Sequence, residues 1–206
     1  NYPYYVKHME MLGLKKDIDW VEFQLKVPEK INPKLQKLND FLSKRVDYEL
    51  VRYTDRKVLE KDAYEAFKVI DEAFSILYGT VPLTDAVINK AIKDNVSMMN
   101  LKYITSIKDK SGEIIGFAVL VPSIAKALKK SNGKLLPFGM FRLLRALQGR
   151  NDTLEMFFVA IKPEYQKKGI PVILINEMIN VCIENGIKYC ETGPELETNK
   201  DVQSLW

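Results

Sequence analysis

Apolar residues between positions 59 and 78 recur every three or four places, which is the period of an amphipathic helix that faces a sheet. This stripe consists of Leu59, Ala63, Phe67, Ile70, Phe74 and Leu77. The same period predicts helices at 4–12, 35–42, 84–94 and 172–185, and a last helix from about Thr198. Glycines at 13, 79 and 186 follow three of these helices, where a left-handed residue commonly ends the last turn.

Shorter apolar runs predict strands at 20–27, 48–53, 102–108, 113–121, 154–161 and 187–192. The run 154–161 is apolar on both faces apart from Glu155, which is typical of a central strand covered on both sides. Ser111-Gly112 predicts a hairpin turn. Because helices and strands interleave along the chain, we expect an α/β (α+β) fold.

The chain is predicted to divide near residue 45. Residues 1–45 form an N-terminal helix-strand appendage and a linker, too small to fold alone, and residues 46–206 form the main domain. Within the main domain, 123–150 is an insertion of two short helices that is amphipathic and basic. Its cations are Lys126, Lys129, Lys130, Lys134, Arg142, Arg145 and Arg150.

Composition places the chain among globular proteins, since 47% of the residues are hydrophobic and 28% are charged. The longest apolar run, 172–183, is interrupted by polar residues and falls short of a membrane span. The first residues lack the features of a signal peptide, and two cysteines are too few for a disulfide framework, so a cytoplasmic location is expected. The net charge of +4 suits an anionic ligand as readily as a nucleic acid.

Several kinds of chemistry are excluded or disfavoured by the residue types present. His8 is the only histidine and lies in the appendage, which excludes a Ser-His-Asp triad or a multi-histidine metal site in the main domain. Cys182 and Cys190 sit in apolar elements and are expected to be inert buried thiols. The aromatic residues at 4, 5, 20 and 23 are expected to pack, and no recognition motif supports nucleic-acid binding.

The segment 158–172 carries the most informative chemistry, because it joins a buried strand directly to the start of a helix. Gly169 permits a positive φ, so that neighbouring backbone amides converge on an anion at the positive end of the helix dipole. Lys167 and Lys168 add charge, and Gln166 either binds a phosphate or braces the loop. The alternative is an ordinary strand-to-helix connection with solvated lysines.

The stretch from Ile161 to Pro171 resembles the coenzyme A loop of the GNAT family (Gcn5-related N-acetyltransferases), which reads Gln/Arg-x-x-Gly-x-Gly/Ala. The resemblance extends over about residues 48–206 and implies a mixed, mostly antiparallel twisted sheet flanked by helices, with acetyl-CoA or another acyl-CoA as cofactor. It implies that the backbone of Val159 and Ile161 pairs with the acyl and pantetheine portion. The loop residues implied to bind the cofactor are Gln166, Lys167, Lys168, Gly169, Ile170 and Val172, and Asn199 is implied to contact the pantetheine.

Two positions depart from the family pattern. Pro171 stands where the family has Gly or Ala, so one amide donor to a phosphate is missing. Trp206 aligns with the tyrosine that gives a proton to the departing thiolate, and an indole is a poor proton donor at neutral pH.

Acylation of an amine requires a base. Glu155, on the central strand, is the first candidate, because its apolar neighbours should partly desolvate it; alternatively it points outward to a lysine of the insertion. Glu191, on the next strand, is the second candidate. Tyr189 is a candidate proton donor, with packing as its alternative role.

These features favour a GNAT-type N-acetyltransferase, in which a small-molecule or peptide amine attacks acyl-CoA directly in a ternary complex. The loop 80–84 and the insertion are expected to wall the acceptor site. The competing hypothesis is a catalytically degenerate module that binds acyl-CoA or has a structural role. No membrane association is expected. Residues 4–27 resemble the closing helix and strands of a GNAT domain, so they either end a preceding module, which we favour, or supply strands to this one; a homodimer is a further alternative.

Overall fold

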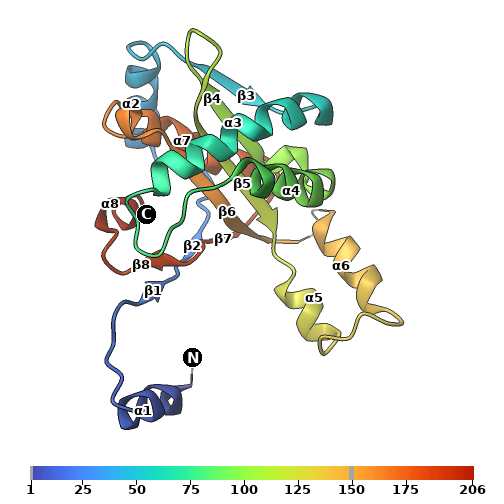
Figure 1. Cartoon of the computed structure of the whole chain (residues 1–206). Coiled ribbons are helices and arrows are strands. Elements are labelled where there is room, and N and C mark those ends of the chain that lie inside the picture. Colours follow the sequence, from blue (N-terminus) through green and yellow to red (C-terminus); the bar gives the residue numbers. More distant parts are fainter. Residues whose placement is uncertain (1, 149–150) are drawn as a thin grey trace.

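A six-stranded sheet forms the centre of the computed structural model, which describes residues 2–148 and 151–206 (Figure 1). Its strand order is β2-β7-β6-β5-β4-β3, and all neighbours are antiparallel except β6 and β7. The expected mixed, mostly antiparallel sheet is therefore confirmed. The strands are β2 (Gln24–Lys26), β3 (Glu49–Arg52), β4 (Ile104–Lys108), β5 (Ile114–Pro122), β6 (Thr153–Ile161) and β7 (Tyr189–Glu191).

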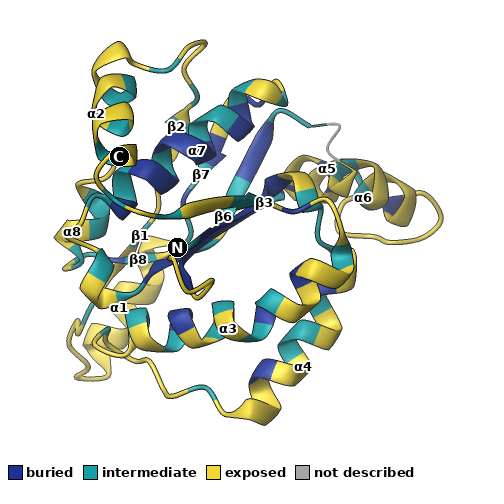
Figure 2. Ribbon diagram, turned by 90° about the horizontal axis from the view of Figure 1, so that it is seen from above, coloured by how far each residue is buried: buried dark blue, intermediate teal, exposed yellow. Residues whose placement is uncertain are grey.

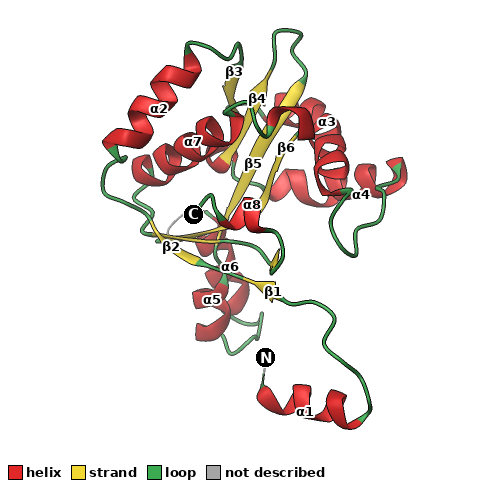
Figure 3. Cartoon of the chain, turned by 90° about the vertical axis from the view of Figure 1, so that its left-hand side faces the viewer, coloured by secondary structure: helices red, strands yellow, loops and turns green. Residues whose placement is uncertain are grey.

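Helices cover both faces of this sheet (Figure 3). One face carries α2 (Pro33–Ser43) and α7 (Ile170–Glu184), and the other carries α3 (Arg56–Phe74) and α4 (Asp85–Asn95). Two separate groups of buried apolar residues result. Leu154 and Leu174 belong to the group on the α7 face, whereas Ile70 and Phe117 belong to the group on the α3 face. Buried residues follow β5 and β6 and the inner sides of these helices (Figure 2).

The helix starts follow local capping chemistry. Thr84 caps α4 as its side chain accepts the Val87 amide at 3.4 Å. The predicted helix at 59–78 is shorter at its end than expected, since α3 stops at Phe74. The Thr80 hydroxyl donates to the carbonyls of Phe74 and Leu77 at 2.9 and 2.8 Å, so the last carbonyls are satisfied by a turn instead of a further helical turn.

The N-terminal segment has two parts with different surroundings. Helix α1 (Pro3–Met11) contains no buried residue and projects from the rest of the molecule (Figure 1). The predicted strand at 20–27 is two short strands, because Phe23 exchanges hydrogen bonds with Thr192 between them. The first, β1 (Trp20–Val21), pairs with β8 (Glu195–Leu196), and the second, β2, forms the edge of the main sheet.

The insertion forms two helices, α5 (Ala125–Lys130) and α6 (Gly139–Leu147), that project from the end of the sheet where β5 stops and β6 starts (Figure 1). Most of the insertion is exposed (Figure 2). Arg150, one of its cations, lies outside the described residues. Three short 3₁₀ helices, at Val96–Met98, Leu101–Tyr103 and Pro163–Tyr165, and α8 (Lys200–Gln203) complete the chain. No helix among the described residues has both the length and the hydrophobicity to cross a bilayer.

Candidate functional site

A fork in the sheet creates the site. Strand β6 runs over nine residues, but β7 pairs with only its first three, Thr153 to Glu155. From Met156 onward the β7 side of β6 has no strand partner in the described sheet, while its other side remains paired with β5. The backbone of Val159 and Ile161 therefore borders the opening of the fork. The backbone carbonyl of Ile161 already accepts a hydrogen bond, because the Gln166 side-chain amide donates to it at 3.0 Å.

Two carboxylates and an amide form a row across the α3 face of the sheet at the base of the fork. Glu155 on β6 is in register with Glu191 on β7, which is in register with Gln24 on β2. Residues in register on neighbouring strands present their side chains to the same face. They line an open depression of about 650 Å³, which we call the carboxylate cleft. Its lining consists of Glu22, Phe23, Gln24, Glu155, Met156, Phe157, Phe158, Glu191, Thr192, Gly193 and Pro194.

The two carboxylates differ in their partners. Gln24 donates its side-chain amide to Glu191 Oε1 at 2.8 Å, which fixes that carboxylate. Within the described part of the chain, no hydrogen bond or ion pair engages the Glu155 carboxylate, and Lys126 of the insertion pairs with Asp152 instead. The carboxylate of the half-buried Glu155 thus has no partner among the described residues. Gln24 is the residue that the sequence did not reveal, since it acquires its neighbour only through strand pairing.

The other predicted residues of this region lie apart from the cleft. Tyr189 is on the same strand face as Glu191, two residues earlier, and is 36% exposed, but it does not line the cleft. The insertion and the loop 80–84 are also absent from its lining, although they were expected to wall the acceptor site. The loop 80–84 contributes instead to a separate depression beside Phe74.

The loop between β6 and α7 adopts the conformation expected from its glycine. Gly169 has φ +84° and precedes the first turn of α7. Among the described residues, no protein acceptor receives the amides of Lys167, Gly169 and Ile170, whereas those of Lys168 and Val172 are bonded within the loop. Lys167 is exposed, and the Lys168 ammonium lies 4.6 Å from the centre of the Tyr165 ring. Three free amides at a helix start fit an anion such as a pyrophosphate.

Helix α2 restricts what can stand at this turn. A Cβ added to Gly169 would lie 2.7 Å from Leu42 Cδ2. We expect Gly169→Ala to lower the free energy of unfolding by about 1 kcal/mol through the positive φ, and by about as much again because Leu42 must move. Gly112→Ala is the matched control, since Gly112 also has φ +84° but, apart from its chain neighbours, no described residue has an atom within 4 Å of such a Cβ. Urea unfolding that gives equal losses for both variants would contradict the role of Leu42.

A second depression, on the α7 face, lies behind the carboxylate cleft and shares Gln24 and Met156 with it. We call it the tryptophan cleft, because Trp206 lines it together with Leu25, Ile179, Cys182 and Cys190. Both cysteines are buried and free, as predicted. The neighbouring Cys182 thiol and burial raise the pKa of Cys190, so that it stays protonated. Asn199 does not line this cleft; its side chain caps α8 by accepting the Val202 amide at 3.4 Å.

An apolar cavity lies on the α3 face, next to the carboxylate cleft, under α3 and α4. Its volume is about 120 Å³, and Phe157 and Phe158 line both spaces. Ala63 and Ala66 on α3 and Ala91 on α4 leave this room, because larger side chains there would fill it. The sequence did not indicate the cavity, since small residues within a helical stripe equally suit close packing.

Comparison with known proteins identifies the chain's relatives. The family described as "Acetyltransferase (GNAT) family" matches residues 70–206. Protein YghO of Escherichia coli (strain K12) is 27% identical over 212 residues, a match that covers 98% of this chain and 53% of that protein. The bacterial ceramide synthase of Caulobacter vibrioides (strain NA1000 / CB15N) is 22% identical over 161 residues, covering 76% of this chain and 42% of the synthase. The chain thus spans about half the length of these curated relatives.

Solved structures share the fold. A GCN5-related N-acetyltransferase from Sphaerobacter thermophilus superposes with a TM-score of 0.58 at 12% identity, covering 98% of this chain and 51% of that one. A tandem GNAT protein from the clavulanic acid biosynthesis pathway superposes with a TM-score of 0.52 at 12% identity, covering 100% of this chain and 55% of that one. At such identities the likeness concerns the fold alone.

Proposed function

Since this chain belongs to the GNAT family of acetyltransferases, we propose that it transfers an acyl group from acyl-CoA to an amine, with attack at the fork between β6 and β7. The observation that carries the proposal is the position of Glu155, an unpaired carboxylate at the base of the fork. The free amides of Lys167, Gly169 and Ile170 at the start of α7 support an anion site of the kind that a coenzyme A pyrophosphate requires. The proposed base and the proposed cofactor site thus belong to one strand and the loop that follows it.

In the proposed reaction, Glu155 removes one proton from the ammonium group of the substrate, and the resulting neutral amine attacks the carbonyl carbon of the acyl-CoA thioester. The N–C bond forms as the C–S bond breaks. Glu191, held by Gln24, supplies a second negative charge that attracts an incoming ammonium group. The nitrogen loses its second proton as the amide forms, and this proton goes to the departing thiolate, directly or through water. Because a thiol titrates near pH 8.5, the thiolate is a good leaving group without a general acid, and a tryptophan at position 206 does not prevent turnover.

One relative supports the formation of an amide. It is named a bacterial ceramide synthase, and a ceramide is a fatty acyl amide. The length comparison supports a second module, because the chain spans about half of its relatives and its fold matches half of a tandem GNAT protein. We therefore propose that the parent protein carries a second GNAT-like unit.

A different observation favours the catalytically degenerate alternative. Pro171 occupies the first turn of α7 and offers no amide. Trp206, which lines the tryptophan cleft, is the residue that the sequence resemblance aligns with the family's proton donor. In that case acyl-CoA binds but is not consumed. Release of free thiol across a panel of amines separates the two functions.

Binding of the cofactor is tested first by thermal unfolding. A ligand that binds only the folded state at about 100 times its Kd stabilises it by about 2.7 kcal/mol, which raises the Tm by about 5 to 10 °C in a protein of this size. We expect this rise with acetyl-CoA or a longer acyl-CoA, and a smaller rise in Gly169→Ala, measured relative to that variant's own Tm. An unchanged Tm with millimolar acyl-CoA of any chain length would refute the cofactor site.

A further inference from the structure

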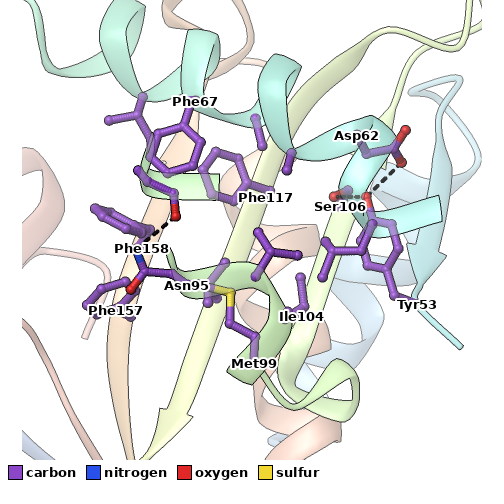
Figure 4. Close-up of a pocket in the computed structure, with 17 residues that line it drawn as sticks. Tyr53, Asp62, Phe67, Asn95, Met99, Ile104, Ser106, Phe117, Phe157 and Phe158 are labelled. Carbon is purple, nitrogen blue, oxygen red and sulfur yellow. Dashed lines mark hydrogen bonds between the residues drawn. The ribbon is translucent and has the colours of Figure 1, made fainter. Parts of the chain in front are cut away.

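The apolar cavity has a hydrocarbon character over most of its wall (Figure 4). Side chains from α3, α4 and strands β4, β5 and β6 surround it, and the labelled Phe67, Phe117, Ile104 and Met99 point into the same space. An apolar cavity of about 150 Å³ in another protein stays dry and binds benzene, so about 120 Å³ is room for a short stretch of hydrocarbon.

The polar groups of the cavity are already satisfied by one another. The Tyr53 hydroxyl lies 2.8 Å from Asp62 Oδ2 and 2.7 Å from Ser106 Oγ, and Lys108 pairs with Asp62 at 2.7 Å. Asn95 donates its side-chain amide to the Ala91 carbonyl. The lining therefore presents no free charge to a ligand, which disfavours a charged or strongly polar group inside.

Two phenylalanines separate the apolar cavity from the carboxylate cleft and line both spaces. The register between β5 and β6 shifts at Val119 and Leu120, so that Phe157 is an extra residue in β6. This bulge brings Phe157 close to Phe158, with ring centres 4.5 Å apart, where both border the cavity and the cleft that contains Glu155. Phe157 is 47% exposed and so forms part of the mouth.

We propose that the apolar cavity binds the aliphatic chain of a substrate whose reactive end lies in the carboxylate cleft. This inference rests on the proposed acyl transfer. Either substrate could supply this hydrocarbon chain: it is attached to the amino group of the amine or to the thioester of the acyl-CoA.

Chain-length series with the full chain test this inference. Amines from butylamine to octylamine, with acetyl-CoA held constant, form one arm, and acyl-CoAs from acetyl to octanoyl, with butylamine held constant, form the other. Each methylene buried in the cavity should raise kcat/KM by about fourfold in the arm that supplies the chain. A flat response in both arms, with turnover present, would overturn the inference and leave the transferase intact.

Filling the cavity should have opposite effects on stability and on chain recognition. Ala66→Leu is expected to raise the Tm and to abolish the rise in kcat/KM with chain length. Ala66→Val is the smaller replacement if the leucine does not fit. The matched control is Ala86→Leu, at an exposed position of α4 outside the cavity. A chain-length dependence that survives a folded Ala66 variant would also refute the proposal.

Failure of the proposed acyl transfer can be distinguished from failure of the proposed chain binding in the cavity. If no amine is acylated, the rise in Tm caused by octylamine or octanoyl-CoA, relative to butylamine or acetyl-CoA, reports the cavity directly. A larger rise with the eight-carbon compound in the wild type, lost in the Ala66 variant, supports the cavity and rejects only the transferase. Equal rises with short and long compounds reject the cavity.

Discussion

Replacing Glu155 by glutamine is expected to lower kcat by about 10² to 10⁴-fold, the usual contribution of a positioned base. The amide has nearly the same shape but cannot take a proton, so the Kd of acyl-CoA should stay unchanged. Thiol release measures turnover, and thermal shift measures binding. The size of the effect follows from the free position of Glu155 in the cleft, where no described residue engages its carboxylate.

Two further variants make this result specific. Glu191→Gln should mainly raise KM for the amine, because Gln24 already holds that carboxylate and its role is to attract the ammonium group. Glu60→Gln, at an exposed position of α3, should leave kcat and KM unchanged. If Glu155→Gln retains full turnover while Glu191→Gln loses it, the base is Glu191 and the assignment to Glu155 is wrong.

Arg52→Ala is expected to lower the free energy of unfolding by about 3 kcal/mol, because it leaves a buried carboxylate without its partner. Arg52 on β3 pairs with Glu177 and donates to both oxygens of Glu184, at 2.7 and 3.1 Å. Hydrogen bonds to Glu177 and then Glu184 raise the pKa of the guanidinium, which stays charged. Arg52 thus links β3, the edge strand of the sheet, to α7. The first turn of α7 contributes to the proposed anion site.

The burial of the two carboxylates predicts a contrast between them. Glu177 is 5% exposed, whereas the Glu184 side chain is 52% exposed, so Glu184→Gln should cost less than about 1 kcal/mol. The double variant Arg52→Ala/Glu177→Gln should regain part of the loss of Arg52→Ala, since no unpaired charge remains buried. Urea unfolding measures all three. A double variant less stable than Arg52→Ala would show that the desolvated charge is not the cause.

Much of the fold followed from the sequence because its signals are local. The three-to-four residue period located α3, α4 and α7, and the β6–α7 loop was expected at Gly169, whose φ of +84° agrees with a turn that only glycine adopts easily. The predicted helix and strand boundaries were wrong where a backbone group forms a hydrogen bond that the local pattern of the sequence does not show. Thr80 ends α3 early, and the pairing of Phe23 with Thr192 divides the strand at 20–27.

The sequence predicted only part of the candidate site. Glu155 and the free amides of the loop lie in one continuous segment, so their association required only that a strand lead into a helix. Glu191 and Gln24 are 167 positions apart, and pair only because β2 lies beside β7. The cavity likewise depends on the packing of α3 and α4 across three strands, and its mouth on a bulge in β6.

The sequence by itself determined the order of the larger helices and of the six strands of the main sheet, and the position of the turn at Gly169, because hydrophobic period and backbone freedom act over a few residues. Only the tertiary structure decided how far β6 and β7 stay paired, which carboxylate is left without a partner, and where a void remains beside it. Those features depend on contacts between residues that are far apart in the chain. No short stretch of sequence determines such contacts.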